Sequence, residues 1–179
     1  MMRALLIALI IFGASMVWDR YNHNKLPLPG FQYAKIARPL GGFAFLDAQG
    51  NPVTVSSFAG NVLVLNFWAT WCAPCVKEMP SLDVLAAQTK GQGIVVIPVA
   101  QQRQDADKIN AFYKEHNITT LGIYFDPSLM GVQMLGIRGL PTTFILDAHG
   151  NLMGTYEGDA DWAAPSIIPF LEQFKIPLP

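Results

Sequence analysis

Two cysteines, Cys72 and Cys75, are the residues of this chain best suited to chemistry, because no other cysteine occurs and only two residues separate them. A strand-like apolar run, residues 62–68, ends just before them, and a helix-like stretch follows. In the first turn of a helix, free backbone amides and the positive end of the helix dipole favour a thiolate over a thiol. Residues i and i+3 of a helix are surface neighbours, so the two sulfurs can form and break a disulfide without unfolding. The pair therefore predicts a redox-active dithiol.

Two other uses of a C-x-x-C pair fit this sequence less well. A structural zinc site needs four ligands, but the chain has no second C-x-x-C, and His23, His116 and His149 show no ligand spacing. A purely structural disulfide that closes so short a loop would restrict the unfolded chain very little. We therefore expect thiol–disulfide exchange and no metal ligands.

The elements around the cysteines alternate between strand-like and helix-like patterns. Residues 62–68 and 94–100 are continuous apolar runs, which are typical of strands buried on both faces. Residues 74–90 carry apolar side chains at helical spacing, and Pro80 inside this helix is expected to kink it. We also predict helices over 105–116, 128–135 and 165–174, a strand over 122–125, and hairpins that join 43–47 to 53–55 and 142–146 to 152–156. This order predicts an α/β domain whose mixed sheet is covered by helices on both faces.

An apolar segment without charges, residues 4–18, lies near the N-terminus. As a helix it would be about 22 Å long, which is shorter than the roughly 30 Å hydrocarbon core of a bilayer. The short length favours a cleaved signal peptide, but the segment has no A-x-A-like cleavage site, and flanking arginines can extend its span. We favour an uncleaved membrane anchor, with a signal peptide and a buried core helix as alternatives. In the first two cases the rest of the chain is exported.

The segment that follows, residues 19–42, holds prolines and glycines without a sustained period. We interpret it as a linker that joins the membrane segment, residues 1–18, to a domain over residues 43–179. The net charge of −1 gives no reason to expect a nucleic-acid-binding surface.

Three stretches resemble the thioredoxin superfamily, and most closely its exported TlpA/ResA-type branch of membrane-tethered thiol-disulfide oxidoreductases. They are N-F-W-A-T-W-C-A-P-C-V-K-E-M-P at residues 66–80, R-G-L-P-T-T-F-I-L-D at residues 138–147, and the hairpin ahead of the first buried strand. The first string is highly specific, whereas the hairpin alone would be a weak signal. The resemblance implies an α/β thioredoxin fold, a mixed central sheet flanked by helices, with an added N-terminal β-hairpin.

The resemblance also implies a substrate-binding surface around the cysteines. Pro141 matches the cis-proline that faces the disulfide, and it would turn the backbone of Leu140 toward Cys72 so that a substrate strand can pair there. Trp71 would shield the reactive sulfur, and Pro74 would stiffen the first turn of the helix. These four residues are the expected substrate contacts.

The group that handles the proton must differ from that of cytosolic thioredoxin, because Asn66 stands where that family has a buried aspartate. An amide cannot accept a proton at neutral pH. Glu78, one helical turn beyond Cys75, matches a glutamate of the TlpA/ResA-type branch and could take the proton of Cys75. The alternative is a solvated acid that complements the helix dipole. Lys77 is expected to be a solvated neighbour.

Four further residues are expected to have packing roles only. Trp68 would pack beneath the cysteine helix. Trp162 is interpreted as part of the entry into the last helix, with no chemical role. Met130 and Met134 are interpreted as flexible side chains that fill gaps in the core.

By this resemblance, Cys72 attacks a substrate disulfide and Cys75 resolves the mixed disulfide. The dipeptide Ala73-Pro74 lacks the histidine of strongly oxidising relatives, which predicts a reductant that needs no cofactor. The expected place is the periplasmic side of a bacterial inner membrane, with residues 4–18 as anchor and a membrane electron donor of the DsbD/CcdA type. The implied substrates are exported disulfide-bearing proteins: a copper chaperone, the copper-bearing subunit of cytochrome oxidase, or apocytochrome c before haem attachment.

Two other functions on related folds are alternatives. A Sco-like copper-binding chaperone uses C-x-x-x-C and a distant histidine as soft ligands, whereas this chain has C-x-x-C and places His149 in a predicted turn. A peroxidase of the peroxiredoxin kind needs a threonine ahead of a lone cysteine. Thr70 is nearby, but the residues from Trp71 to Pro74 do not match that pattern.

Overall fold

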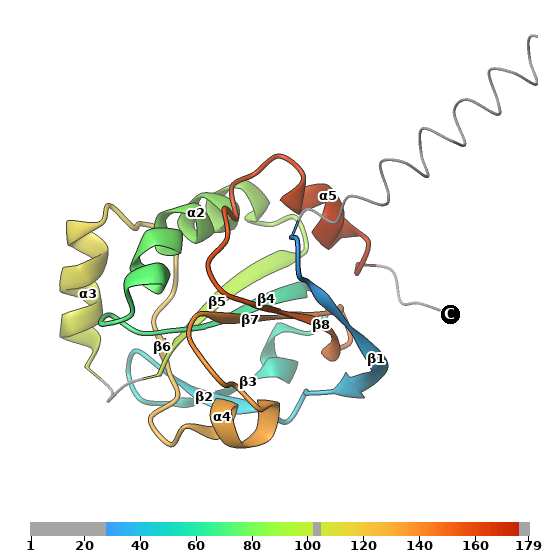
Figure 1. Ribbon diagram of the computed structural model, residues 1–179. Helices are drawn as coiled ribbons and strands as arrows, with labels where there is room; N and C mark the ends of the chain where they lie inside the picture. The colour runs from blue at the N-terminus through green and yellow to red at the C-terminus, as the bar shows by residue number, and fades with distance from the viewer. Residues whose placement is uncertain (1–27, 102–104, 176–179) are drawn as a thin grey trace, which may run out of the picture.

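Strand β4, Val62–Trp68, leads directly to the cysteines and lies in the interior of an eight-stranded sheet (Figure 1). The computed structural model describes residues 28–101 and 105–175. The strand order is β1-β8-β7-β4-β5-β6-β2-β3, and β4 pairs in parallel with β5 and antiparallel with β7. The other strands are β1 Gln32–Pro39, β2 Ala44–Asp47, β3 Pro52–Thr54, β5 Ile94–Ala100, β6 Tyr124–Phe125, β7 Thr142–Leu146 and β8 Asn151–Glu157.

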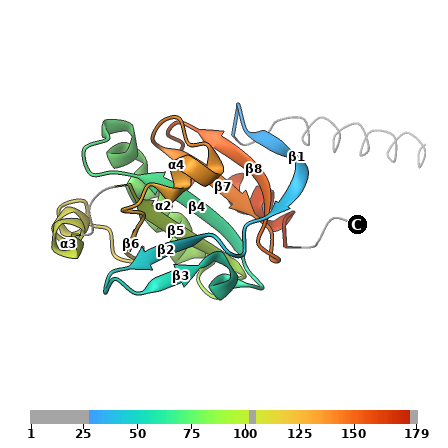
Figure 2. The same cartoon turned by 90° about the horizontal axis from the view of Figure 1, so that it is seen from below.

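Helices cover both faces of this sheet, which confirms the predicted α/β architecture (Figures 1 and 2). Every residue of β4 is buried, and successive side chains point to opposite faces. The face with Val64 and Trp68 packs against three helices, and the face with Leu65 and Phe67 packs against the β2 strand and a short helix. The helices are α2 Ala73–Thr89, α3 Ala106–Glu115 and α5 Ile167–Glu172 on the first face, and α4 Met130–Leu135 with the 3-10 turn Val55–Phe58 on the second.

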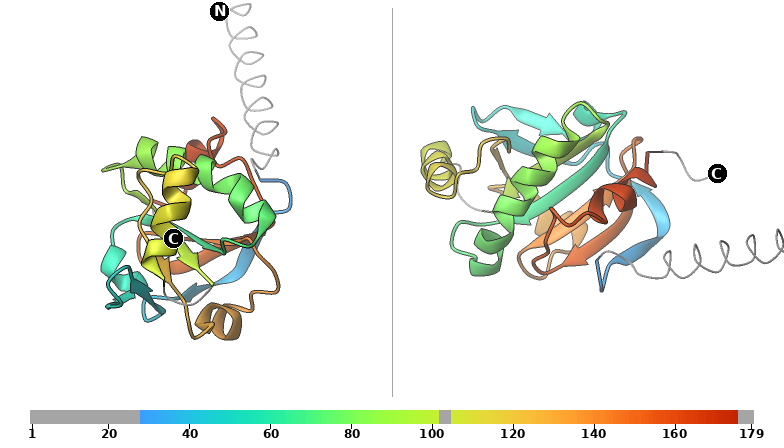
Figure 3. Two further views of the ribbon diagram at one scale, coloured as in Figure 1. Left: turned by 90° about the vertical axis from the view of Figure 1, so that its left-hand side faces the viewer. Right: turned by 90° about the horizontal axis from the view of Figure 1, so that it is seen from above.

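Helix α2 extends from the cysteines across the sheet, as seen from above in Figure 3. Cys72 is its N-cap residue, and Pro74 lies in its first turn, where the absent N–H has no helical partner to lose. Met79, Leu82 and Leu85 form its buried stripe. The predicted helix over 74–90 is therefore confirmed, and it continues through Pro80 to its last residue at 89.

The predicted hairpin near the N-terminus is confirmed as β2 and β3, although Val55 belongs to the following 3-10 turn and is buried. Four other elements are shorter than predicted: β6, α3, α4 and α5. The proposed packing role is right for Met130, which packs against the second core cluster. It is wrong for Met134, whose side chain is 48% exposed.

The predicted linker over residues 19–42 is wrong for the part that the structure describes. Residues 32–39 form β1, an edge strand that pairs antiparallel with β8. Just ahead of it, Phe31 is buried against Phe170 of α5, with ring centroids 5.0 Å apart. Residues 1–27 lie outside the described part, so the expected membrane segment is not seen. Among the helices in the described part of the chain, none has the length and apolar character needed to cross a bilayer.

Gly154 of β8 lies opposite Tyr33 of β1, so β1 passes directly beside it. A Cβ atom there would lie 2.7 Å from the backbone oxygen of Gln32 and would also overlap the Phe31 ring. We therefore expect Gly154→Ala to lower the free energy of unfolding by about 1–3 kcal/mol, because the backbone cannot yield as a flexible side chain would. Urea denaturation measures this loss. Gly42→Ala is the control, since a Cβ at Gly42 meets nothing within 4 Å, and an equal loss in both variants would contradict the explanation.

Candidate active site

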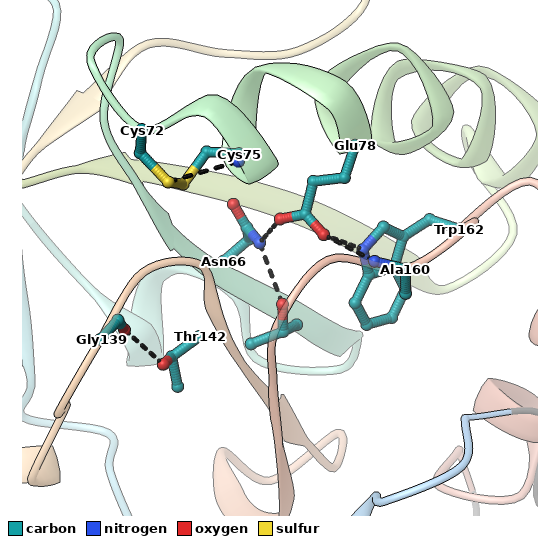
Figure 4. The surroundings of a disulfide bond; sticks show 9 residues. Asn66, Cys72, Cys75, Glu78, Gly139, Thr142, Ala160 and Trp162 are labelled. Carbon is teal, nitrogen blue, oxygen red and sulfur yellow. Dashed lines mark hydrogen bonds between the residues drawn. A yellow bond between two sulfur atoms is a disulfide. The ribbon is translucent and has the colours of Figure 1, made fainter.

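The two cysteines form a disulfide at the start of α2, with their Cα atoms 5.2 Å apart (Figure 4). The Cys72 sulfur accepts a hydrogen bond of 3.3 Å from the backbone N–H of Cys75. Cys72 is 6% exposed and Cys75 is 0% exposed. Both cysteines are thus buried, Cys72 slightly less so than Cys75, and the Cys72 sulfur faces a helix-terminal amide.

Trp71 and Pro74 surround the cysteines on the outer side. Trp71 is 71% exposed, the largest exposure of any tryptophan in the described residues, and Pro74 is also exposed. The Trp71 side chain lines a surface depression together with Lys108 and Phe112 of α3. The Trp71 indole and the Pro74 ring therefore lie exposed beside Cys72, where a substrate can contact them without any unfolding of the site.

The peptide bond between Leu140 and Pro141 is cis, as the sequence comparison with thioredoxins implies. Pro141 immediately precedes β7, whose first residue, Thr142, pairs with Phe67 near the end of β4. The cis peptide therefore lies at the end of the sheet where the cysteine loop leaves β4. The Thr142 hydroxyl donates to the Gly139 carbonyl at 2.8 Å and closes this turn (Figure 4).

Glu78 is buried, with 2% of its surface exposed, one turn beyond Cys75. Its Oε1 atom accepts a hydrogen bond from Asn66 Nδ2 at 2.8 Å. Its Oε2 atom accepts from Trp162 Nε1 at 2.9 Å and from the Ala160 backbone N–H at 3.1 Å. The interpretation of Glu78 as a solvated acid is wrong, because this carboxyl group lies inside the protein between the disulfide and the loop after β8 (Figure 4).

The pKa of Glu78 is raised to about 7, mainly because burial removes the water that would stabilise the charged form, and the charge of Asp159 adds to the rise. The three hydrogen bonds oppose this rise, because each favours the carboxylate. Lys77 does not offset the charge directly: it is exposed and forms an ion pair of 2.6 Å with Asp159. Glu78 is consequently able to gain and lose a proton near neutral pH.

Asn66 joins Glu78 to the sheet. Its side chain is fully buried, and Nδ2 donates both to Glu78 and to the Thr143 hydroxyl, the latter at 2.9 Å. Its Oδ1 atom has no hydrogen-bond partner among the described residues. In Figure 4 this oxygen is on the side of the disulfide, while the nitrogen is on the side of Glu78. The amide therefore contacts the carboxyl group through its nitrogen and leaves its oxygen without a partner among the described residues.

The two buried tryptophans, Trp68 and Trp162, make different kinds of contact. Trp68 packs against Phe112 and Tyr113 of α3, so its predicted packing role is confirmed. Trp162 was expected to have no chemical role, yet its indole N–H contacts Glu78. No local pattern could reveal this pair, because 84 positions separate the two residues. Among the described residues, no group of three or more His, Cys, Asp or Glu side chains could hold a metal ion.

The sequence of this chain matches the Redoxin family over residues 27–167. A protein from Bacillus anthracis called thiol-disulfide oxidoreductase ResA is 30% identical over 129 residues, which are 70% of this chain and 71% of that protein. The protein of the same name from Bacillus thuringiensis subsp. konkukian is 28% identical over 125 residues, 70% of this chain and 71% of its own length.

Two similar solved structures also come from proteins named as a thioredoxin or a thiol:disulfide interchange protein. The exposed lipoprotein thioredoxin Etrx1 of Streptococcus pneumoniae has a TM-score of 0.62 and 27% identity, and the match covers 73% of this chain and 98% of that one. A putative thiol:disulfide interchange protein DsbE from Chlorobium tepidum has a TM-score of 0.59 and 27% identity, with 82% and 94% covered.

Proposed function

This chain belongs to the Redoxin family and is a thiol-disulfide oxidoreductase of the ResA type, and from that premise we propose that it reduces disulfide bonds in exported proteins. The observation that carries this proposal is the arrangement of three groups along one helix: the less buried cysteine at Cys72, a fully buried cysteine at Cys75, and a buried carboxyl group at Glu78.

The reaction follows from these positions. In the reduced protein, the Cys72 thiolate attacks one sulfur of a substrate disulfide, and the other substrate sulfur leaves as a thiolate. Cys75 then loses its proton to Glu78 and attacks the Cys72 sulfur. The bond between Cys72 and the substrate breaks, the second substrate sulfur leaves as a thiolate, and the Cys72–Cys75 disulfide forms. Two electrons have passed to the substrate, whose two thiolates take up protons from solvent or from Glu78.

The substrate would bind across the outer face of this site. Trp71 and Pro74 offer exposed apolar surface beside Cys72, and half-buried Leu140 precedes the cis-proline Pro141. A backbone strand of the substrate that paired at Leu140 would bring its disulfide over Cys72. Specificity would then arise from side chains that contact Trp71 and the nearby depression.

We place the protein on the periplasmic side of a bacterial inner membrane, attached through residues 4–18. A membrane donor of the DsbD/CcdA type would return it to the reduced form. The proposed substrates are a copper chaperone, the copper-bearing subunit of cytochrome oxidase, or apocytochrome c before haem attachment. What supports the exported location is the apolar N-terminal segment and the likeness to an exposed lipoprotein of another bacterium.

The reduction potential tests the direction of electron flow. Equilibration with glutathione should give a potential closer to the roughly −270 mV of thioredoxin than to the roughly −120 mV of strong oxidants. Pro74→His should raise the potential, because an added cation near the helix start stabilises the reduced form through the Cys72 thiolate. Ala87→His, at an exposed position near the far end of α2, is the control. A wild-type potential near −120 mV would reverse the assignment.

A further inference from the structure

We propose that Trp162 is a positioning residue for the resolving step, because its indole N–H holds the Glu78 carboxylate ionised and fixed in place one helical turn beyond Cys75. This inference rests on the proposed function of Glu78 as the acceptor of the Cys75 proton. It assigns to a residue of the C-terminal loop a part in the chemistry of the cysteine helix.

The first argument is the kind of partner that Glu78 has. Asn66 Nδ2, Trp162 Nε1 and the Ala160 backbone N–H all donate to its two oxygens, at 2.8, 2.9 and 3.1 Å. A carboxylate accepts on both oxygens, whereas a neutral carboxyl group must donate through one of them. If Glu78 were protonated, the hydrogen on one of its oxygens would point at an N–H donor, and a hydrogen bond would be lost. The site is built for the charged form in spite of its burial.

The second argument is that Trp162 is itself rigidly held. Its side chain is fully buried and lies edge-on to Tyr156 of β8, with ring centroids 6.2 Å apart. Its backbone N–H donates to the Ser81 hydroxyl at 3.0 Å, and this hydroxyl donates to the Glu78 carbonyl at 2.8 Å. These hydrogen bonds join the loop after β8 to α2 next to Glu78. The indole N–H therefore has a fixed position relative to the Glu78 carboxyl group.

The third argument concerns the charges around Glu78. Burial raises its pKa, and the Trp162 hydrogen bond is the largest of the effects that lower it. Asp159 adds a repulsive charge, but Asp159 is itself paired with Lys77 at the surface. These two residues and exposed Asp161 line a depression on the outer side of the same loop. Of these three, Asp159 acts on Glu78 through its charge, and Trp162 is the uncharged group that most favours the carboxylate.

The resolving step can be followed with the disulfide reagent DTNB and the reduced full-length protein. Cys72 attacks DTNB and releases one thionitrobenzoate, and Cys75 then displaces the second from Cys72 as the protein disulfide forms. Stopped-flow absorbance separates the two phases, and the pH dependence of the second phase reports how readily Cys75 loses its proton.

The variant that isolates the indole N–H carries 3-benzothienylalanine at position 162, since this analogue keeps the ring shape but has sulfur in place of N–H. Loss of one hydrogen bond to a carboxylate should make the second phase about tenfold slower near pH 6.5. The rate should approach that of the normal protein above pH 9, and the first phase should not change. The same analogue at position 68 is the control, because Trp68 Nε1 has no hydrogen-bond partner among the described residues.

The outcomes distinguish this inference from the proposed function. If the analogue at position 162 slows both phases at every pH, or neither, Trp162 has only a packing role and the inference is wrong. If Glu78→Gln removes the pH dependence while the analogue leaves it intact, the role of Glu78 stands and that of Trp162 fails. If Glu78→Gln itself leaves the profile unchanged, the proton acceptor is another group and both proposals fall.

Discussion

Replacing Cys75 by serine is expected to leave substrate proteins covalently attached to Cys72. The serine hydroxyl is a far weaker nucleophile than a thiolate, so the mixed disulfide persists and turnover falls on the order of a thousandfold. Because Cys72 is the less buried of the two cysteines and is unchanged in this variant, the attacking sulfur remains fully competent. Non-reducing electrophoresis of the host's membrane and exported proteins, followed by mass spectrometry, would identify what is bound.

Cys72→Ser is the matched control, since it keeps one cysteine in the same helix turn but removes the less buried one. It should trap nothing, as Cys75 cannot reach a protein disulfide from its buried position. Accumulation of mixed disulfides on the Cys72→Ser variant, and not on the other, would reverse the roles of the two cysteines. The identity of the trapped proteins also chooses among a copper chaperone, an oxidase subunit and an apocytochrome.

The features that sequence could predict are those fixed by short stretches of chain. Strand β4 is a continuous apolar run because it is buried on both faces, and α2 follows from helical spacing and a proline in its first turn. The cis peptide before Pro141 was predicted only through resemblance to thioredoxins, since few X–Pro bonds in folded proteins are cis.

Strand β1 escaped prediction for a physical reason. Seven of its eight residues are exposed and one is half-buried, so it lacks the alternation of apolar and polar side chains that marks a strand with one buried face. It pairs at the sheet edge through its backbone. Neighbouring prolines and glycines, which are typical of linkers, also suit an edge strand.

The surroundings of Glu78 show the other limit. Its spacing from Cys75 identified it as a candidate, but that spacing agreed equally well with a solvated acid and with a proton acceptor. The decision depends on Asn66, Ala160 and Trp162, which lie 12, 82 and 84 positions away. Burial is produced by these tertiary contacts, and no local pattern around residue 78 contains them.

Glu78→Gln is expected to change both activity and the pH dependence of stability. Without a carboxylate to take the Cys75 proton, the resolving step should slow on the order of a hundredfold at neutral pH. The free energy of unfolding should change in the opposite direction to activity: relative to the normal protein, that of the variant should rise as pH increases. The folded-state pKa of Glu78 is raised from 4.5 to about 7, so the folded protein holds this proton more tightly than the unfolded chain. The normal protein therefore loses stability as pH rises from about 4.5 to about 7.

A difference of 7 − 4.5 pKa units corresponds to about 3 kcal/mol. Urea unfolding of the oxidised protein should be measured at pH 5 and at pH 8. From the first pH to the second, the free energy of unfolding of Glu78→Gln should rise by about 3 kcal/mol relative to that of the normal protein. The oxidised form is the right one to use, because its cysteines do not titrate. Glu172→Gln, at an exposed position of α5, should give no such gain. The gain in stability and the loss of resolving activity have one cause, which is the ionised carboxylate of Glu78 inside the protein. If Glu78→Gln slowed the resolving step without the pH-dependent gain in stability, the buried charge would not be the origin of catalysis.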